Sequence, residues 1–309
     1  MTGRQITRAE LTTAQVTEIL ALVGAARLAD AVAPLSEPTL LHLRYDPSAA
    51  GHDFILTAGG EIAGYAYLDS PAGPESEVSG ELVIHPGRRR RGLGRALVTE
   101  LIAAAGGHAL RLWAHGDLPA AAGLAATTGF ERFRALWQMR RPLRDPLGQP
   151  VFPPGRTLRT FVPGRDEDEW LGLNGRAFAK HPEQGGWTRH DLELREREPW
   201  FDPAGFFIAE KDGAMAGFHW TKVHPPEPPS PGIGEVYVIG VDPAEQGSGL
   251  GRALTLAGLH HLRDLGLAQV MLYVDEDNPA AIRMYETLGF TRTRVDAMYR
   301  FSPGGRPPR

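Results

Sequence analysis

The sequence predicts an α+β fold made of two tandem domains, and three observations carry this prediction. The first is an internal repeat, because VIHPGRRRRGLGRAL at residues 83–97 aligns without a gap on GVDPAEQGSGLGRAL at residues 240–254. The second is that strands and helices are expected in the same order in both halves. The third is the length of 309 residues, which suits about two domains of ordinary size. Together they indicate a tandem duplication of one domain.

The elements of the two halves can be paired in chain order. A first helix is expected at EILALVGAARLADAV, which has helical spacing. Strand pairs follow at DFILTAGGEIAGYAYLD and FFIAEKDGAMAGFHWTKV, each turning at a short glycine-containing segment. GELVIHP and GEVYVIGVDP predict strands that end at a proline. Amphipathic helices come next, at GRALVTELIAAA and GRALTLAGLHHLRDLG.

The last elements of the two halves also correspond. ALRLWAH and QVMLYVDE predict a further strand in each half. NPAAIRMYETLGF predicts a helix that ends at a turn and an aromatic residue, and LPAAAGLAATTGF is its counterpart in the first half. RALWQMRRP and RVDAMYRF predict a final strand in each half.

These assignments place the boundaries of the domains. The first domain is expected at residues 1–143 and the second at residues 157–302. Residues 144–156 are expected to form a linker, because RRPLRDPLGQPVFPPGRT is rich in proline and glycine. The tail at residues 303–309 is expected to be disordered.

Composition excludes several classes of protein. The formal net charge of −4 argues against a general nucleic-acid or membrane-coating role. There is no cysteine, so disulfides, thiolate metal sites and a cysteine nucleophile are excluded. The start of the chain is too polar for a signal peptide, and no apolar run approaches the ~20 residues of a membrane span. We therefore expect a soluble cytoplasmic protein.

The repeated glycine turn, between a strand and a helix, has the character of an anion site. Glycines allow positive φ and close approach of a ligand, and the first N–H groups of a helix lack internal partners. Such a turn suits a pyrophosphate. A P-loop would need Gly-Lys-Ser/Thr, and a dinucleotide-binding fingerprint would need a third glycine. Neither copy of the turn matches either motif. A plain surface turn is disfavoured because the motif occurs twice.

The GRRRR run at residues 87–91 could form a nucleic-acid patch. The protein is acidic, however, and the run has no interleaved aromatic residues, so a phosphate-facing or solvated turn is favoured.

With these motifs the sequence resembles the GCN5-related N-acetyltransferase (GNAT) superfamily. Its pyrophosphate loop has the pattern Gln/Arg-x-x-Gly-x-Gly/Ala, which residues 246–251 and 89–94 match. Its second signature, an Asn followed by a Tyr and then Leu-Gly-Phe, matches Asn278, Tyr285 and residues 288–290. The resemblance implies in each half a central mixed, mostly antiparallel β-sheet flanked by helices. It also implies an acetyl-CoA-dependent acyl transferase.

The two halves are not equivalent in chemistry. Leu118 stands where the second half has Asn278, and Ala125 stands where it has Tyr285. Leucine and alanine offer a thioester neither a proton nor a polar contact. We therefore expect the first half to be catalytically degenerate, and either to bind acetyl-CoA still or to keep the fold and cover the substrate of the second half.

The second half carries groups suited to acetyl transfer to an amine. An α-amino group has a pKa near 8, so a carboxylate acting directly or through water can complete its deprotonation. Glu235 opens a strand just before the glycine turn and is the candidate base, with an ordinary strand-start carboxylate as the alternative interpretation. Backbone N–H groups of residues 239–241 could stabilise the oxyanion. Tyr285 is the candidate proton donor to the leaving thiolate, and the alternative is a core aromatic residue.

Across nearly the whole chain the sequence is similar to the tandem acetyltransferases of actinobacterial mycothiol biosynthesis. The similarity rests on VAPLSE, LWAHGDL, HPEQGGW, GFHWTKVH and GEVYVIGVDP. It implies acetylation of the cysteinyl amine of cysteinyl-glucosaminyl-inositol, with Glu235 as base and Tyr285 as acid. The implied acceptor contacts are Glu37, Glu183, Lys222, Glu235 and Tyr273. The loop at residues 225–234 is proline-rich, which leaves the geometry between Lys222 and Glu235 open.

The same resemblance implies the contacts to acetyl-CoA. In the second half they are Ile239, Gly240, Val241, Gln246, Gly247, Ser248, Gly249, Leu250, Gly251, Arg252, Asn278, Pro279, Ala280, Ala281, Ile282 and Arg283. In the first half they are Leu82, Val83, Ile84, Arg90, Arg91, Gly92, Leu93, Gly94 and Arg95.

Other functions stay open at this point. His181, His219 and His224 suggest a metal site, but they lack ligand spacing on one element and the superfamily uses no metal, so none is expected. A monomer is expected, because the duplication supplies an internal pseudo-dimer. One alternative is a tandem acetyltransferase for another amine, such as an aminoglycoside or a protein N-terminus. Another is a non-catalytic CoA-sensing module.

Overall fold

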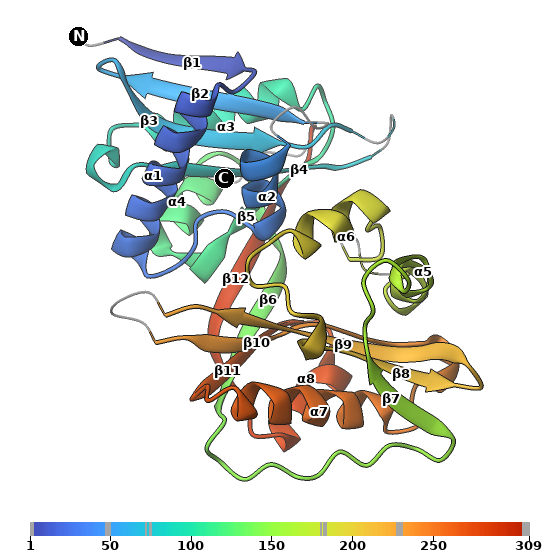
Figure 1. Cartoon of the computed structure of the whole chain (residues 1–309). Helices are drawn as coiled ribbons and strands as arrows, with labels where there is room; N and C mark the ends of the chain where they lie inside the picture. The colour runs from blue at the N-terminus through green and yellow to red at the C-terminus, as the bar shows by residue number, and fades with distance from the viewer. Residues whose placement is uncertain are drawn as a thin grey trace. The chain divides into compact units, whose positions relative to one another are not determined.

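The computed structural model describes residues 3–46, 51–71, 73, 76–179, 181, 184–226 and 231–304 (Figure 1). Glu183, part of the proline-rich loop at residues 225–234 and most of the expected disordered tail lie outside the described residues. The chain divides into two compact units, and each is described by itself. The first unit comprises Met1–Leu136 and Arg294–Arg309, and the second comprises Trp137–Thr293.

The first unit is an α+β structure. Its strands lie in the order β1-β2-β3-β4-β5-β12, and β4 with β5 is a parallel pair in an otherwise antiparallel set of described pairs. The elements are β1 (Arg4–Ala9), α1 (Thr13–Asp30), α2 (Glu37–Tyr45), β2 (His52–Ala58), β3 (Glu61–Leu68), β4 (Val78–Ile84), η1 (Pro86–Arg88), α3 (Leu93–Ala104), β5 (Leu110–Ala114), η2 (His115–Asp117), α4 (Pro119–Thr127) and β12 (Thr291–Phe301).

The second unit repeats this plan. Its strands lie in the order β6-β11-β10-β9-β8-β7, and β10 with β11 is again a parallel pair. The elements are β6 (Glu131–Pro142), β7 (Arg156–Thr160), α5 (Glu167–Ala177), α6 (Arg189–Glu196), η3 (Pro203–Gly205), β8 (Phe206–Lys211), β9 (Ala214–His224), β10 (Ile233–Val241), η4 (Pro243–Glu245), α7 (Leu250–Asp264), β11 (Gln269–Asp275) and α8 (Pro279–Thr287). The predicted fold class, two mixed and mostly antiparallel sheets flanked by helices, is confirmed.

The units differ from the predicted boundaries in where the last strand of each repeat lies. The repeats predict domains at residues 1–143 and 157–302, but β12 of the second repeat pairs with β5 inside the first unit. The later residues of β6, from the first repeat, lie beside β11 inside the second unit. The compact units therefore exchange their last strands.

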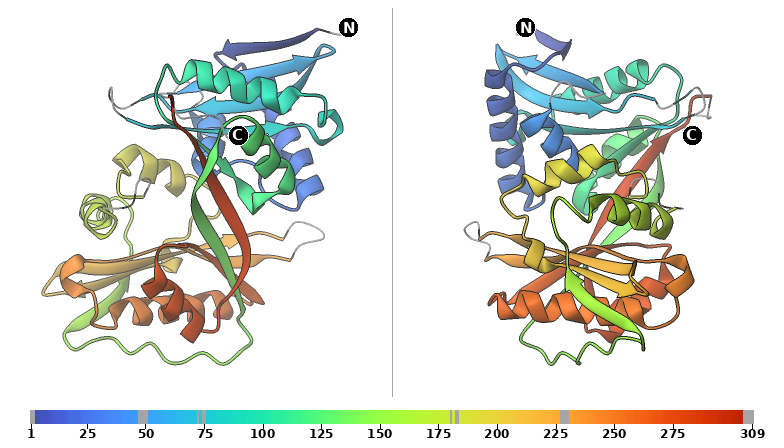
Figure 2. Two further views of the ribbon diagram at one scale, coloured as in Figure 1. Left: turned by 180° about the vertical axis from the view of Figure 1, so that it is seen from behind. Right: turned by 45° about the vertical axis from the view of Figure 1, so that its right-hand side comes forward.

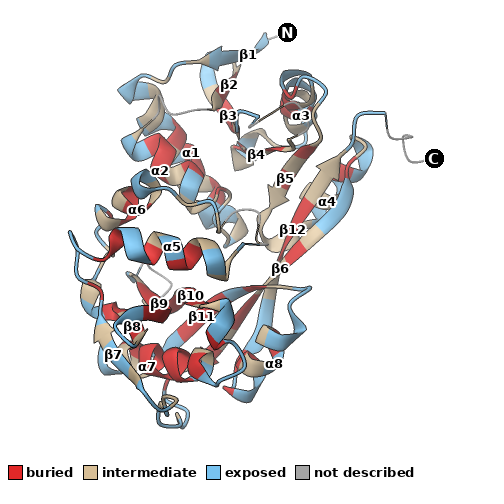
Figure 3. Ribbon diagram, turned by 90° about the vertical axis from the view of Figure 1, so that its right-hand side faces the viewer, coloured by how far each residue is buried: buried red, intermediate tan, exposed pale blue. Residues whose placement is uncertain are grey.

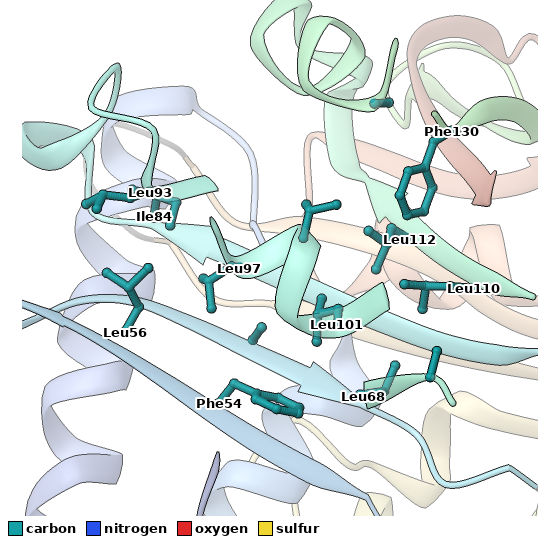
Figure 4. Close-up of a cluster of buried hydrophobic side chains, with 14 of the residues drawn as sticks. Phe54, Leu56, Leu68, Ile84, Leu93, Leu97, Leu101, Leu110, Leu112 and Phe130 are labelled. Atoms are coloured by element: carbon teal, nitrogen blue, oxygen red, sulfur yellow. The ribbon is translucent and has the colours of Figure 1, made fainter. Parts of the chain in front are cut away.

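In the first unit the sheet is covered on both faces, and Figure 2 shows α1 and α3 on opposite sides of it. Leu97 and Leu101 of α3 pack with Phe54 in one buried cluster, drawn in Figure 4. Ile19 of α1 packs with Tyr65 of β3 in a second cluster on the other face. Burying each such side chain is worth about 1.5–3 kcal/mol, so both helices are held by the sheet.

The second unit has the same two layers of helices. Trp170 of α5 packs with Trp220 of β9 in one cluster, to which α6 also contributes. On the opposite face, α7 packs against the sheet through a buried stripe that is red in Figure 3. None of the helices in the described part of the chain combines the length and the apolar character that a membrane span needs.

Candidate functional site

The two central parallel strands of the second unit separate partway along their length. The parallel pairing of β10 with β11 runs from Gly234 to Val236. The pairing of β10 with β9 shifts register between Val236 and Val238, which makes Tyr237 a β-bulge. Residues 239–241 lie beyond the last residue paired with β11 and continue only along β9. Bulges redirect side chains and end pairing. We call the region beyond Val236, where the described pairing of β10 with β11 has ended, the strand gap.

The glycine turn of the second unit lies between the end of β10 and the start of α7. Gly247 and Gly249 have φ of 77° and 90°, values that favour glycine. Gly249 is the N-cap of α7, and glycine has no side-chain oxygen to occupy the N–H groups of the first turn. Ser248 Oγ donates to the carbonyl of Glu245 at 2.7 Å and so fixes the turn. These amide groups can receive a pyrophosphate, as the sequence predicts.

The first unit keeps the same turn with different anchoring. Gly92 is the N-cap of α3 with φ 75°, but Arg90 adopts φ 63° where the second repeat has Gly247. Arg89, at the position of Gln246, forms two 2.7 Å hydrogen bonds to the carboxylate of Asp30. These bonds of the Arg89 guanidinium connect the turn to the last residue of α1. Of the predicted contacts here, Leu82, Val83 and Ile84 are the last residues of β4.

Glu235, the predicted base, lies buried on β10 directly opposite Lys222 of β9. Its Oε2 lies 2.5 Å from Nε2 of His224. The ammonium of Lys222 lies 4.1 Å from the ring centroid of Trp200 and 4.9 Å from that of Tyr237. The structure thus brings together two predicted residues, Glu235 and Lys222. It adds His224, which the sequence analysis considered only as a metal ligand, and Trp200, to which it assigned no role.

Tyr285, the predicted acid, lies on α8 in the second unit. It is buried, and its ring meets that of Phe290 edge to face at 5.7 Å. Burial raises the pKa of its hydroxyl above the usual value, so the phenol is protonated at neutral pH. A protonated phenol is the form that can donate to a thiolate.

Asn278 has a structural role that the sequence did not separate from ligand contact. It is the N-cap of α8, and its Oδ1 accepts a hydrogen bond from the N–H of Ala281 at 3.1 Å. Pro279 to Arg283 form the start of the same helix. Leu118 holds the N-cap position of α4 in the first unit, where leucine offers no acceptor.

The other predicted acceptor residues are spread over the chain. Tyr273 on β11 is 39% exposed, and its hydroxyl accepts a hydrogen bond from Nε2 of Gln138 at 2.8 Å. Gln138 comes from β6, the final strand of the first repeat. No sequence signal pointed to this residue, because its strand was expected in the other unit. Glu37 is the first residue of α2 in the first unit.

The first unit contains a cavity of about 570 Å³ in the place that corresponds to the strand gap. Its lining includes Arg90 and Gly92 of the turn, and also Leu118 and Ala125. Alanine at the position of Tyr285 leaves room where a phenol would stand. The cavity is therefore large enough for part of a coenzyme, while its walls lack the proton donor.

A half-buried histidine in the first unit, His115, is held between two carboxylates. His115 lies 3.1 Å from Glu81 and 3.1 Å from Asp296, the latter on β12. Burial alone would lower the pKa of His115, but these hydrogen bonds outweigh it and raise the pKa to about 10. The charged imidazolium of His115 thus links β12, through Asp296, to Glu81 of β4 in the first unit.

The histidines first considered as metal ligands have other partners. His181 lies 3.3 Å from Asp275, and His219 Nδ1 lies 2.8 Å from the carbonyl of Leu254. Among the residues that the structure describes, no group of three or more His, Asp or Glu side chains could hold a metal ion.

Stability is expected to fall between pH 6.5 and pH 4 because of His219. Burial lowers the pKa of its imidazole to about 4, because a charged ring would lose its solvation. The ring is closely packed: a Cβ added at Gly258 would lie only 2.2 Å from it. The neutral ring therefore contributes stability above pH 6.5 that is lost as the pH falls towards 4. The full loss is about 3 kcal/mol, at about 1.4 kcal/mol for each pKa unit.

Urea unfolding of the wild type and of His219→Gln at pH 7 and pH 4.5 measures this contribution. We expect the variant to lose less stability than the wild type over the interval. Equal losses of stability would show that His219 does not cause the effect.

His115 acts in a separate pH range. Because its pKa is raised, it contributes stability below pH 6.5 that disappears as the pH rises through about 10.

The chain is similar in sequence to proteins of one family. The acetyltransferase (GNAT) family model matches residues 25–130 and 174–290. The chain is 62% identical over 283 residues to a mycothiol acetyltransferase of Thermobispora bispora, covering 91% of this chain and 94% of that protein. It is 60% identical over 294 residues to a mycothiol acetyltransferase of Thermomonospora curvata, covering 95% and 96%.

A solved structure shares the whole fold. It is a tandem GNAT protein from the clavulanic acid biosynthesis pathway, with a TM-score of 0.73 and 24% identity, and the match covers 98% of this chain and 100% of that one. At this identity the likeness concerns the fold alone.

Proposed function

The chain belongs to the GNAT acetyltransferase family, in its mycothiol acetyltransferase branch, and we propose that it acetylates the cysteinyl amine of cysteinyl-glucosaminyl-inositol to give mycothiol and CoA. The observation that supports this most is the composition of the second unit. That unit contains a strand gap, a helix capped by glycine, a buried carboxylate at Glu235 and a protonated phenol at Tyr285.

Acetyl-CoA is a co-substrate that the second unit binds, in this proposal, through the turn at residues 246–252 and the start of α8. The diphosphate takes the N–H groups at the start of α7, which lack acceptors within the helix. The amides of residues 239–241 then face the thioester carbonyl and stabilise its oxyanion. In the first unit the same contacts can hold a coenzyme, but without a phenol at Ala125 they do not complete transfer.

The reaction proceeds by direct attack of the amine on the thioester. Glu235 removes a proton from the ammonium, the nitrogen forms a bond to the carbonyl carbon, and a tetrahedral intermediate results. The carbon–sulfur bond then breaks and Tyr285 gives a proton to the thiolate. The nitrogen loses its second proton, which restores the phenol of Tyr285. Two protons leave the nitrogen; one ends on CoA and one in solvent.

The acceptor offers an ammonium and several hydroxyls, and the second unit has groups that suit both. Glu235 attracts the ammonium. Lys222, held against Trp200 and Tyr237, and the exposed phenol of Tyr273 can bond the hydroxyls of the glucosamine or inositol. Glu183 and Glu37 stay predictions from the resemblance.

Release of CoA with defined amines tests the proposal. Purified full-length protein is given acetyl-CoA and cysteinyl-glucosaminyl-inositol, and in parallel an aminoglycoside or a peptide with a free N-terminus. We expect rapid CoA release with the first acceptor and N-acetylation of its cysteine. Efficient acetylation of another amine, with none of the first, would overturn the acceptor assignment.

A further inference from the structure

Among the described residues, the buried carboxylate of Glu235 contacts a side chain that is partly exposed, that of His224. His224 Nε2 lies 2.5 Å from Glu235 Oε2, and the side chains are 34% and 10% exposed respectively. His224 ends β9 opposite Ile233, two pairs along from the pairing of Lys222 with Glu235. Because alternate residues of a strand share one face, His224 and Lys222 lie on the face that Glu235 occupies.

The proposed reaction leaves this carboxylate with a proton to dispose of. For each acetyl group transferred from CoA to an ammonium, one proton must reach bulk solvent. A carboxylate that is 10% exposed exchanges protons with water poorly while a substrate covers it. A group in contact with both the carboxylate and the surface would remove this restriction.

We propose that His224 carries the proton that Glu235 removes from the acceptor to solvent, and so resets the base in each turnover. The inference rests on the proposed role of Glu235. In the step, the O–H bond of protonated Glu235 breaks as Nε2 of His224 gains the proton, and the imidazolium then loses a proton to water or buffer. No oxidant, reductant or further reactant is needed. His224 is a positioning residue in that it acts through Glu235.

The charged groups around this pair explain why a histidine suits the role. Lys222 lies across from Glu235, and its ammonium faces Trp200 and Tyr237. Arg195 of α6 donates from Nε to the hydroxyl of Tyr237 at 2.8 Å. Lysine and arginine keep their protons at neutral pH, whereas imidazole gains and loses one in that range. Of the side chains named here that contact Glu235 or lie beside it, His224 is therefore the one suited to pass the proton of Glu235 on to solvent.

A purely orienting role for His224 would use the same hydrogen bond, so the variants must separate the two. His224→Gln keeps an N–H donor but cannot transfer a proton. His224→Ala removes both and leaves space for a small carrier. His260→Gln, at a histidine whose Nε2 meets the carbonyl of Gly148, is the matched control.

The experiment measures kcat at saturating acceptor and acetyl-CoA, in low buffer and with added imidazole, over a range of pH. We expect kcat to fall about 10²-fold in both His224→Gln and His224→Ala, at the low end for proton-transfer groups. Added imidazole should restore His224→Ala, and the rate of both variants should depend on buffer concentration. His260→Gln should match the wild type.

A wild-type kcat in His224→Gln would overturn the relay, and so would loss of activity in His224→Ala that imidazole does not restore. Glu235→Gln in the same assay separates this result from failure of the proposed function. If Glu235→Gln is impaired and His224→Gln is not, the relay alone fails. If Glu235→Gln retains the wild-type rate, the proposed base itself is wrong.

Discussion

Replacing Glu235 by glutamine is expected to lower kcat by about 10²–10⁴-fold, the range typical of a general base. Glutamine keeps the size of the side chain but cannot accept the proton of the ammonium. Because Glu235 is buried and lies next to His224 and Lys222, its carboxylate is held in place and cannot easily be replaced by a neighbour. Steady-state kinetics of CoA release measure the effect.

The control for this variant is Glu286→Gln, at an exposed glutamate on α8. It should leave kcat unchanged. Since glutamine is nearly isosteric, the thermal unfolding temperature of Glu235→Gln should stay close to that of the wild type. A Glu235→Gln enzyme that turned over at the wild-type rate would remove this residue from the mechanism.

Replacing Tyr285 by phenylalanine is expected to lower kcat by about 10²-fold, because the thiolate then leaves without a positioned proton donor. The ring itself is preserved, so its edge-to-face contact with Phe290 and its place in the buried cluster should survive. The KM for acetyl-CoA should change little, since the phenol acts on the leaving sulfur rather than on the diphosphate. Initial rates at varied acetyl-CoA separate the two parameters.

Tyr45→Phe, which removes a phenol hydroxyl from α2 of the first unit, serves as the control and should keep the wild-type kcat. An unchanged kcat in Tyr285→Phe would show that water protonates the thiolate. Tyr285 would then be a core aromatic residue, the alternative that the sequence left open.

The fold and the two glycine turns could be predicted from the sequence because their signals are local. A glycine with positive φ at a helix N-cap, as at Gly92 and Gly249, is a short-range requirement that the motif itself expresses. The edge strands β1 and β7 were not predicted, because RQITRA and RTLRT are short and each carries two arginines; in the structure their residues are exposed or half-buried. Edge strands tolerate such residues.

The exchange of β6 and β12 could not be predicted, because strand pattern does not specify which of two similar sheets a strand completes. Two contacts that depend on this exchange could not be predicted either. They are the hydrogen bonds of Gln138 with Tyr273 and of Asp296 with His115, which join residues more than a hundred positions apart in the sequence. The contact of His224 with Glu235 depends on the register of β9 and β10 and on the bulge at Tyr237. The sequence contains both residues but does not determine that register.

The most direct test of the account is a crystal structure of the full-length protein with acetyl-CoA. The account predicts the diphosphate on the amides of residues 247–251, and the thioester in the strand gap of the second unit within reach of Glu235 and Tyr285. Coenzyme bound in the first unit as well would be compatible with its cavity. A second unit left empty, or a thioester directed away from Glu235, would contradict the central claim.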